Sequence, residues 1–224
     1  MRHLPTLLLA LMLGPLGLLG LLGLFGSSRA DTDPMEAALA AYEAGDMKTA
    51  AASFAALSAR KAPLADYNLA MMHLRDELPR PNVREAKRLL ERAAAKKLVR
   101  AELALGQFYE QGLLGKPDLR RATSWFERAA AHGSVEAQVA VGTAFYLGRG
   151  ATKDMARAAR WFREAATGGD VGAQYLLASM YESGLGLAAD FRLARYWYDI
   201  AARNGDEAAP AKVEELDKFL ASAT

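Results

Sequence analysis

The stretch VEAQVAVGTAFYLGRGATKDMARAARWFREAATGG, residues 135–169, decides the fold. Its first part, Glu136 to Leu147, carries small and apolar residues at helical spacing without proline, so we expect a helix there. Gly148-Arg149-Gly150 ends this helix, because glycine adopts the left-handed conformation found at helix ends. Asp154 is expected to cap a second helix, Met155 to Thr167, which ends at Gly168-Gly169. Two short helices joined by a tight loop predict an antiparallel hairpin.

The same pattern returns every 36 residues. The positions that share this interval are Trp125, Trp161 and Trp197; Ala101, Ala137 and Ala173; Gly112, Gly148 and Gly184; Asp118, Asp154 and Asp190; and Ala122, Ala158 and Ala194. A fixed period of ~20–50 residues is typical of stacked repeat units. The sequence therefore predicts an all-α fold, an α/α superhelix (solenoid) of antiparallel helix hairpins. We expect residues 35–222 to form about eleven short helices on a right-handed path.

The period continues toward the N-terminus in weaker form. Ala65, Ala70 and Ala86 keep the register, while Leu89 stands where later units have tryptophan. We therefore assign residues 31–98 to degenerate N-terminal repeats, 99–134, 135–170 and 171–206 to three regular repeats, and 207–224 to a C-terminal capping helix.

The repeat unit resembles the Sel1-like repeat, a relative of the tetratricopeptide repeat (TPR) with a longer loop. The matching residues in the third unit are Ala137, Gly142, Phe145, Gly148, Gly150, Asp154, Ala158, Trp161, Phe162, Ala165, Ala166 and Gly169. The second unit departs from the pattern at Gly112-Leu113-Leu114-Gly115, which lacks the tight Gly-x-Gly. The resemblance implies a scaffold or adaptor that binds a protein or peptide partner in envelope assembly, secretion or signalling. The alternatives are a cell-wall or β-lactam hydrolase of the Sel1-like type and a purely structural subunit of an envelope complex.

The first 30 residues have the features of a signal peptide. A basic start, Met1-Arg2-His3, precedes an apolar run within residues 4–26, and the small residues Ser28 and Ala30 follow. We predict cleavage after Ala30 and a periplasmic or secreted protein. An uncleaved inner-membrane anchor is the alternative, because ~20 apolar residues can span a bilayer. Repeated glycines and two prolines in this run favour cleavage, since they disfavour a lasting helix.

The charge balance limits the classes of partner, and the lack of cysteine limits how the fold is stabilised and anchored. The formal charge of +2 comes from Arg2 and Arg29, so residues 31–224 carry equal numbers of basic and acidic groups. Such a balance offers no electrostatic footprint for nucleic acid or for an anionic membrane. Without cysteine, an exported fold rests on packing alone, and a lipid-modified cysteine anchor is excluded.

Neither a catalytic motif nor a cofactor motif is recognisable. Gly148-Arg149-Gly150 follows a predicted helix, whereas phosphate-binding loops follow a strand and carry lysine and hydroxyl residues. His3, His73 and His132 share no metal-ligand spacing, and we expect His73 and His132 to be surface residues. We therefore expect no catalytic residue, no cofactor and no metal.

The predicted partner-binding surface is a row on the first helices of the hairpins. It follows from repeat-equivalent and i+4/i+7 positions and comprises Asn68, Met72, Ala104, Phe108, Gln111, Ala140, Leu147, Leu176 and Ser183. Asn68 is its most informative member, because an amide can bind a partner's backbone or carboxylate. The alternative is that this row is ordinary hydrated surface. The tryptophans are interpreted as core residues and not as a ligand-stacking site, since they keep register with the paired alanines.

Overall fold

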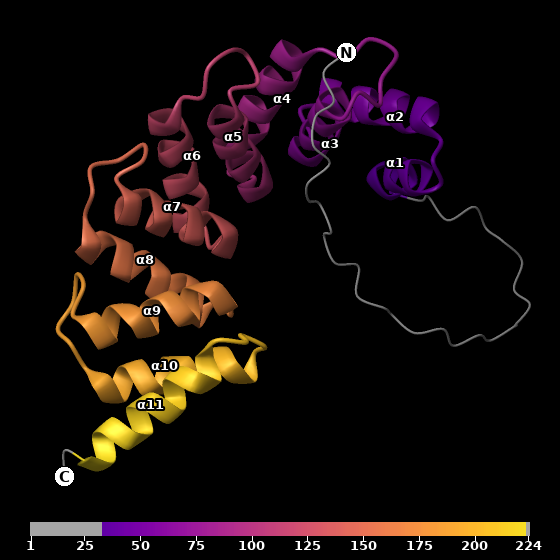
Figure 1. The fold of residues 1–224 in the computed structure, drawn as a ribbon. Coiled ribbons are helices and arrows are strands. Elements are labelled where there is room, and N and C mark those ends of the chain that lie inside the picture. Colours follow the sequence, from indigo (N-terminus) through magenta and orange to yellow (C-terminus); the bar gives the residue numbers. More distant parts are fainter. Residues whose placement is uncertain (1–32, 223–224) are drawn as a thin grey trace, which may run out of the picture. The chain divides into compact units, whose positions relative to one another are not determined.

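The computed structural model describes residues 33–222, and this part of the chain forms eleven α-helices (Figure 1). They are α1 (Pro34–Glu43), α2 (Met47–Ala59), α3 (Pro63–Leu74), α4 (Val83–Ala95), α5 (Val99–Gln111), α6 (Leu119–Ala131), α7 (Val135–Leu147), α8 (Met155–Thr167), α9 (Val171–Ser183), α10 (Phe191–Arg203) and α11 (Ala209–Ser222). The predicted all-α fold of about eleven helices is confirmed. The predicted signal peptide, residues 1–30, lies outside the described residues.

The helices pack in the order of the chain. α1 pairs with α2, α3 with α4, α5 with α6, α7 with α8 and α9 with α10, and the second helix of each pair packs on the first helix of the next. Figure 1 shows this order from indigo α1 to yellow α11. Sequential packing of helical hairpins is the arrangement expected of a repeat protein. The right-handed path stays a prediction.

The predicted ends of the helices are confirmed in the regular repeats. The Asp154 side chain accepts a hydrogen bond of 2.9 Å from the backbone N–H of Arg157, and Asp118 and Asp190 cap α6 and α10 in the same way. Gly148 ends α7 in the left-handed conformation with φ of +72°. Local residue choice therefore sets where each helix begins and ends.

The second glycine of each Gly-x-Gly loop touches the preceding hairpin. A Cβ on Gly150 would lie 2.3 Å from the carbonyl oxygen of Leu119, and a Cβ on Gly186 would lie 2.1 Å from that of Met155. Leu119 and Met155 are the first residues of α6 and α8. The loop of one repeat thus rests on the start of the second helix of the repeat before it, and only glycine permits this distance.

The core depends on the residue after each tryptophan. Phe162 is 1% exposed, and its ring packs so closely on α7 that a Cβ on Gly142 would lie 2.8 Å from it. Trp161 packs against the same apolar cluster but stays partly exposed, and Trp125 and Trp197 are likewise partly buried. The tryptophans therefore pack at the margin of the core. The aromatic residue that follows each of them, Phe126, Phe162 or Tyr198, is buried in its centre.

Candidate partner-binding surface

The structure divides the predicted row into core and surface residues. Met72, Ala104 and Phe108 are 0%, 8% and 2% exposed, so the prediction that they face a partner is wrong. Met72 belongs to the apolar cluster around Phe54, and Ala104 to the cluster around Leu89. Neighbouring helices cover these positions, which a helical pattern taken from one helix could not show.

The remaining members of the row lie at or near the surface. Gln111, Leu147 and Ser183 are exposed, and Asn68, Ala140 and Leu176 are partly buried. Leu147 is 51% exposed. These six residues are the part of the row that a partner can reach.

Asn68 carries an amide nitrogen without a hydrogen-bond partner. The side chain of Asn68 is partly buried, and its Nδ2 atom is buried yet bonds to no group in the described part of the chain. The corresponding positions of the later repeats hold Ala104, Ala140 and Leu176. A buried donor without a partner costs ~1–3 kcal/mol, so a hydrogen bond formed by this amide would stabilise the protein.

Ala140 and Leu147 meet at a small cavity. A hollow of about 150 Å³ lies where α5, α6 and α7 adjoin, and it is lined by both residues, by Phe126 and by Glu110. Most of its lining residues are apolar, and Glu110 and Arg149 add charge, which suits an aliphatic side chain of a partner better than a polar metabolite. The structure thus brings two predicted residues together and adds Glu110 and Phe126, which the sequence analysis did not select.

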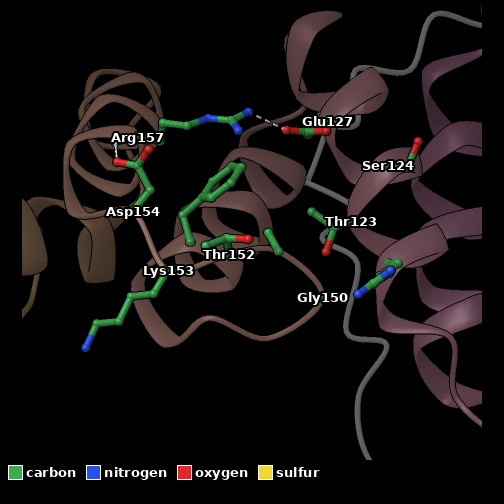
Figure 2. A pocket seen from close by; sticks show the side chains of 11 residues that line it. Thr123, Ser124, Glu127, Gly150, Thr152, Lys153, Asp154 and Arg157 are labelled. Atoms are coloured by element: carbon green, nitrogen blue, oxygen red, sulfur yellow. Dashed lines mark hydrogen bonds and ion pairs between the residues drawn. The ribbon is translucent and has the colours of Figure 1, made fainter.

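A second cavity of about 280 Å³ lies between α6 and the loop from α7 to α8 (Figure 2). Arg157 donates to Glu127 over 2.7 Å, and its guanidinium carbon lies 3.8 Å from the centre of the Phe145 ring. The Thr123 hydroxyl donates to the Leu119 carbonyl over 2.9 Å. The Arg157–Glu127 bond therefore links α8 to α6, whereas the Thr123 bond lies within α6.

The two histidines of the described residues have structural roles. His73 Nδ1 accepts a hydrogen bond of 3.2 Å from the backbone N–H of Asn82, and burial lowers the pKa of His73 against the opposing effect of Glu85. His132 Nδ1 lies 2.7 Å from Glu102 Oε2. Within residues 33–222, no three His, Cys, Asp or Glu side chains are grouped so that they would hold a metal ion.

A set of buried polar residues escaped the sequence analysis. Asp66, Glu102, Gln138 and Gln174 stand 36 residues apart near the starts of α3, α5, α7 and α9 and are 1%, 0%, 8% and 2% exposed. The sequence does contain the pattern that indicates them, because an acid or an amide recurs at the same position of each of these repeats. We define these four residues as the polar column.

The last helix is attached through a polar contact as well as an apolar one. Glu182 on α9 accepts hydrogen bonds of 2.7 Å from both Tyr198 and Lys212. Burial alone would raise the pKa of Glu182, but these bonds from Lys212 and Tyr198 hold it below its usual range. The ionised carboxylate therefore ties α11 to the repeat before it.

None of the helices in residues 33–222 has the length and apolar character needed to cross a bilayer.

Comparisons with known proteins agree with this architecture. The Sel1 repeat model matches residues 63–98, 99–134, 135–170 and 171–206. A protective antigen of uropathogenic Escherichia coli with an SLR fold superposes with a TM-score of 0.71 at 25% identity, over 77% of this chain and 37% of the antigen. A Sel1 repeat protein from Oxalobacter formigenes superposes with a TM-score of 0.66 at 29% identity, over 82% of this chain and 50% of the other.

The chain thus spans half or less of the length of these two structures. No curated protein sequence matches it. The match of the Sel1 repeat model to four consecutive repeats, which fold as sequential helix hairpins, shows that the chain belongs to the Sel1 repeat family.

Proposed function

We propose that this protein is an exported scaffold that binds a protein or peptide partner along the accessible row on the first helices of its hairpins. The observation that carries this proposal is the unpaired amide nitrogen of Asn68, which is buried at a repeat position that is otherwise apolar and reaches a partner when its side chain turns outward. The apolar cavity at Ala140 and Leu147 continues the same row. An extended peptide would place a carbonyl at Asn68 and an aliphatic side chain in the cavity.

The family adds support, since Sel1 repeats typically mediate protein interactions. A repeat stack offers a continuous surface, and function on such a fold resides in the side chains placed along it. Export rests on the sequence of residues 1–30, and cleavage after Ala30 would release a periplasmic or secreted protein. N-terminal sequencing of the protein from its native host tests this part; a chain that retains residues 4–26 in the membrane fraction would instead be an anchored scaffold.

The binding proposal is tested by affinity capture from envelope extract with matched variants. Asn68→Ala and Leu147→Glu should each lower the amount of captured partner several-fold. Asn68→Ala removes a hydrogen-bond donor, and Leu147→Glu places a charge beside an apolar cavity. Leu193→Glu is the control, since Leu193 is 39% exposed on the second helix of its hairpin and lies outside the row. Equal loss in all three folded variants, or no loss in the first two, would show that the row does not bind the partner.

A further inference from the structure

Three members of the polar column find partners that the repeat itself supplies. Arg92 donates to the Asp66 carboxylate. The Glu102 carboxylate accepts a hydrogen bond of 3.1 Å from the Arg128 guanidinium, and its second oxygen lies 2.7 Å from Nδ1 of His132.

In the last repeat, Gln174 donates to the Ala166 carbonyl over 3.1 Å, and its Oε1 accepts from Asn204 over 3.0 Å. Arg92 and Arg128 stand in register, and so do His132 and Asn204. Each of these three buried side chains is thus matched by a donor from the second helix of its hairpin or from the end of that helix.

The third repeat lacks both donors. Gln138 donates to the Ala130 carbonyl over 3.4 Å, as Gln174 does in its repeat, but its Oε1 atom is buried without a hydrogen-bond partner in the described residues. Glu164 stands where Arg128 stands in the repeat before, and Gly168 stands where His132 and Asn204 stand. The chain itself therefore leaves this acceptor unpaired, which costs free energy until a donor arrives.

Gln138 is one of the residues that line a cavity. Its volume is about 360 Å³, and its lining includes Gln138, Arg160, Trp161 and Glu164. Trp161 is partly exposed and Glu164 is exposed, and neither Glu164 nor Arg160 forms an ion pair within residues 33–222. Gln138, Trp161 and Glu164 thus line one hollow at the surface.

The second repeat shows what fits such a hollow. There the Arg128 guanidinium carbon lies 4.2 Å from the centre of the Trp125 ring, while Nη2 reaches Glu102. Trp161, Glu164 and Gln138 occupy the corresponding three positions of the third repeat. The indole and the buried acceptor are kept, and the arginine between them is replaced by an acid.

We infer that this cavity, the Trp161 cavity, binds the guanidinium of an arginine side chain from a partner protein or peptide. The guanidinium stacks on the Trp161 indole, donates to Gln138 Oε1 and pairs with the Glu164 carboxylate. It takes the place that Arg128 fills within the second repeat. Arg160 also lines the cavity and opposes a cationic ligand, so it weakens binding. The site shares no residue with the row that contains Asn68, so either site can fail without the other.

The test uses a short blocked peptide with one arginine and the same peptide with citrulline, which is isosteric and uncharged. Binding is followed through the indole N–H signal of Trp161 in the folded protein by NMR titration. The arginine peptide should shift this signal in a saturable way, and the citrulline peptide should bind at least several-fold more weakly. Arg160→Ala should strengthen binding of the arginine peptide, and Leu193→Ala, at an exposed residue outside the cavity and the row, should leave it unchanged.

Two variants separate binding from folding. Glu164→Arg restores the arrangement of the second repeat within the chain, so it should abolish peptide binding and raise the melting temperature. Glu207→Arg is the control, because it makes the same change of charge at an exposed residue outside the cavity. Equal binding of the two peptides, no shift of Trp161, or unchanged binding by Glu164→Arg would each overturn the inference.

Discussion

Replacing Gly150 with alanine should destabilise the protein more than the same replacement at Gly169. Both glycines have positive φ, +80° and +95°, so alanine meets a similar backbone cost at each, roughly 1–2 kcal/mol. Only at Gly150 does the new methyl group also collide with another helix. It would lie 2.3 Å from the Leu119 carbonyl oxygen and 2.6 Å from Thr123 Oγ1, whereas no heavy atom lies within 4 Å at Gly169.

The collision sets the size of the difference. The Leu119 carbonyl belongs to the backbone of α6 and cannot rotate away, so the loop or the hairpin must move. Forcing an added carbon into a packed contact typically costs about 1–3 kcal/mol. We therefore expect Gly150→Ala to be less stable than Gly169→Ala by that amount, which corresponds to roughly 2–12 °C in melting temperature for a protein of this size.

Thermal and urea denaturation, followed by far-UV circular dichroism, measure the difference. Gly186→Ala provides an independent repeat of the test, because its methyl group would lie 2.1 Å from the Met155 carbonyl oxygen. Gly150→Ala and Gly186→Ala should both have lower melting temperatures and lower free energies of unfolding than Gly169→Ala. If all three variants lost the same stability, the loops would not rest on the preceding hairpins as described, and the reasoning would be refuted.

Three further predictions concern buried groups. Arg92→Ala should cost about 3–5 kcal/mol, because it leaves the buried Asp66 carboxylate without its guanidinium; a loss below about 1 kcal/mol in urea denaturation, as for a surface pair, would contradict this. Phe162→Ala should lose about 3–5 kcal/mol and more than Trp161→Ala, since Phe162 is 1% exposed and Trp161 only partly buried; melting temperatures in the reverse order would count against the core described here. Burial lowers the pKa of His73 below its ordinary value of 6.5, so the unfolded chain takes up this proton at a higher pH than the folded one. Its contribution to stability is therefore complete above that value and is lost as the pH falls through the lower folded pKa. His73→Asn should flatten the acid side of the stability profile, and an unchanged slope would show that His73 does not contribute.

The sequence by itself determined the elements and their order. Asp154 and Gly148 bound the helices through bonds to their own neighbours in the chain, so a local pattern suffices to predict them. The 36-residue interval adds that each hairpin meets the next in the same way. The family and the all-α repeat fold follow from these two facts.

The exposure of the residues in the proposed row was predicted only in part, because burial depends on how neighbouring hairpins cross. Leu147 and Met72 are both apolar residues on first helices, yet Leu147 is 51% exposed and Met72 is 0% exposed. No spacing within one helix distinguishes them, since the covering side chains come from other helices. The same limit explains why Trp161 was assigned to the core although part of it borders a cavity.

The unpaired oxygen of Gln138 shows the limit most clearly. The sequence contains Gln138, Glu164 and Gly168 at positions that other repeats fill with an acid or amide and its donors. Only the tertiary structure shows that Gln138 and Glu164 meet, because α7 and α8 bring them to the lining of one cavity. Sequence fixes which groups a repeat carries, and the packing of the helices decides which of those groups are left without a partner.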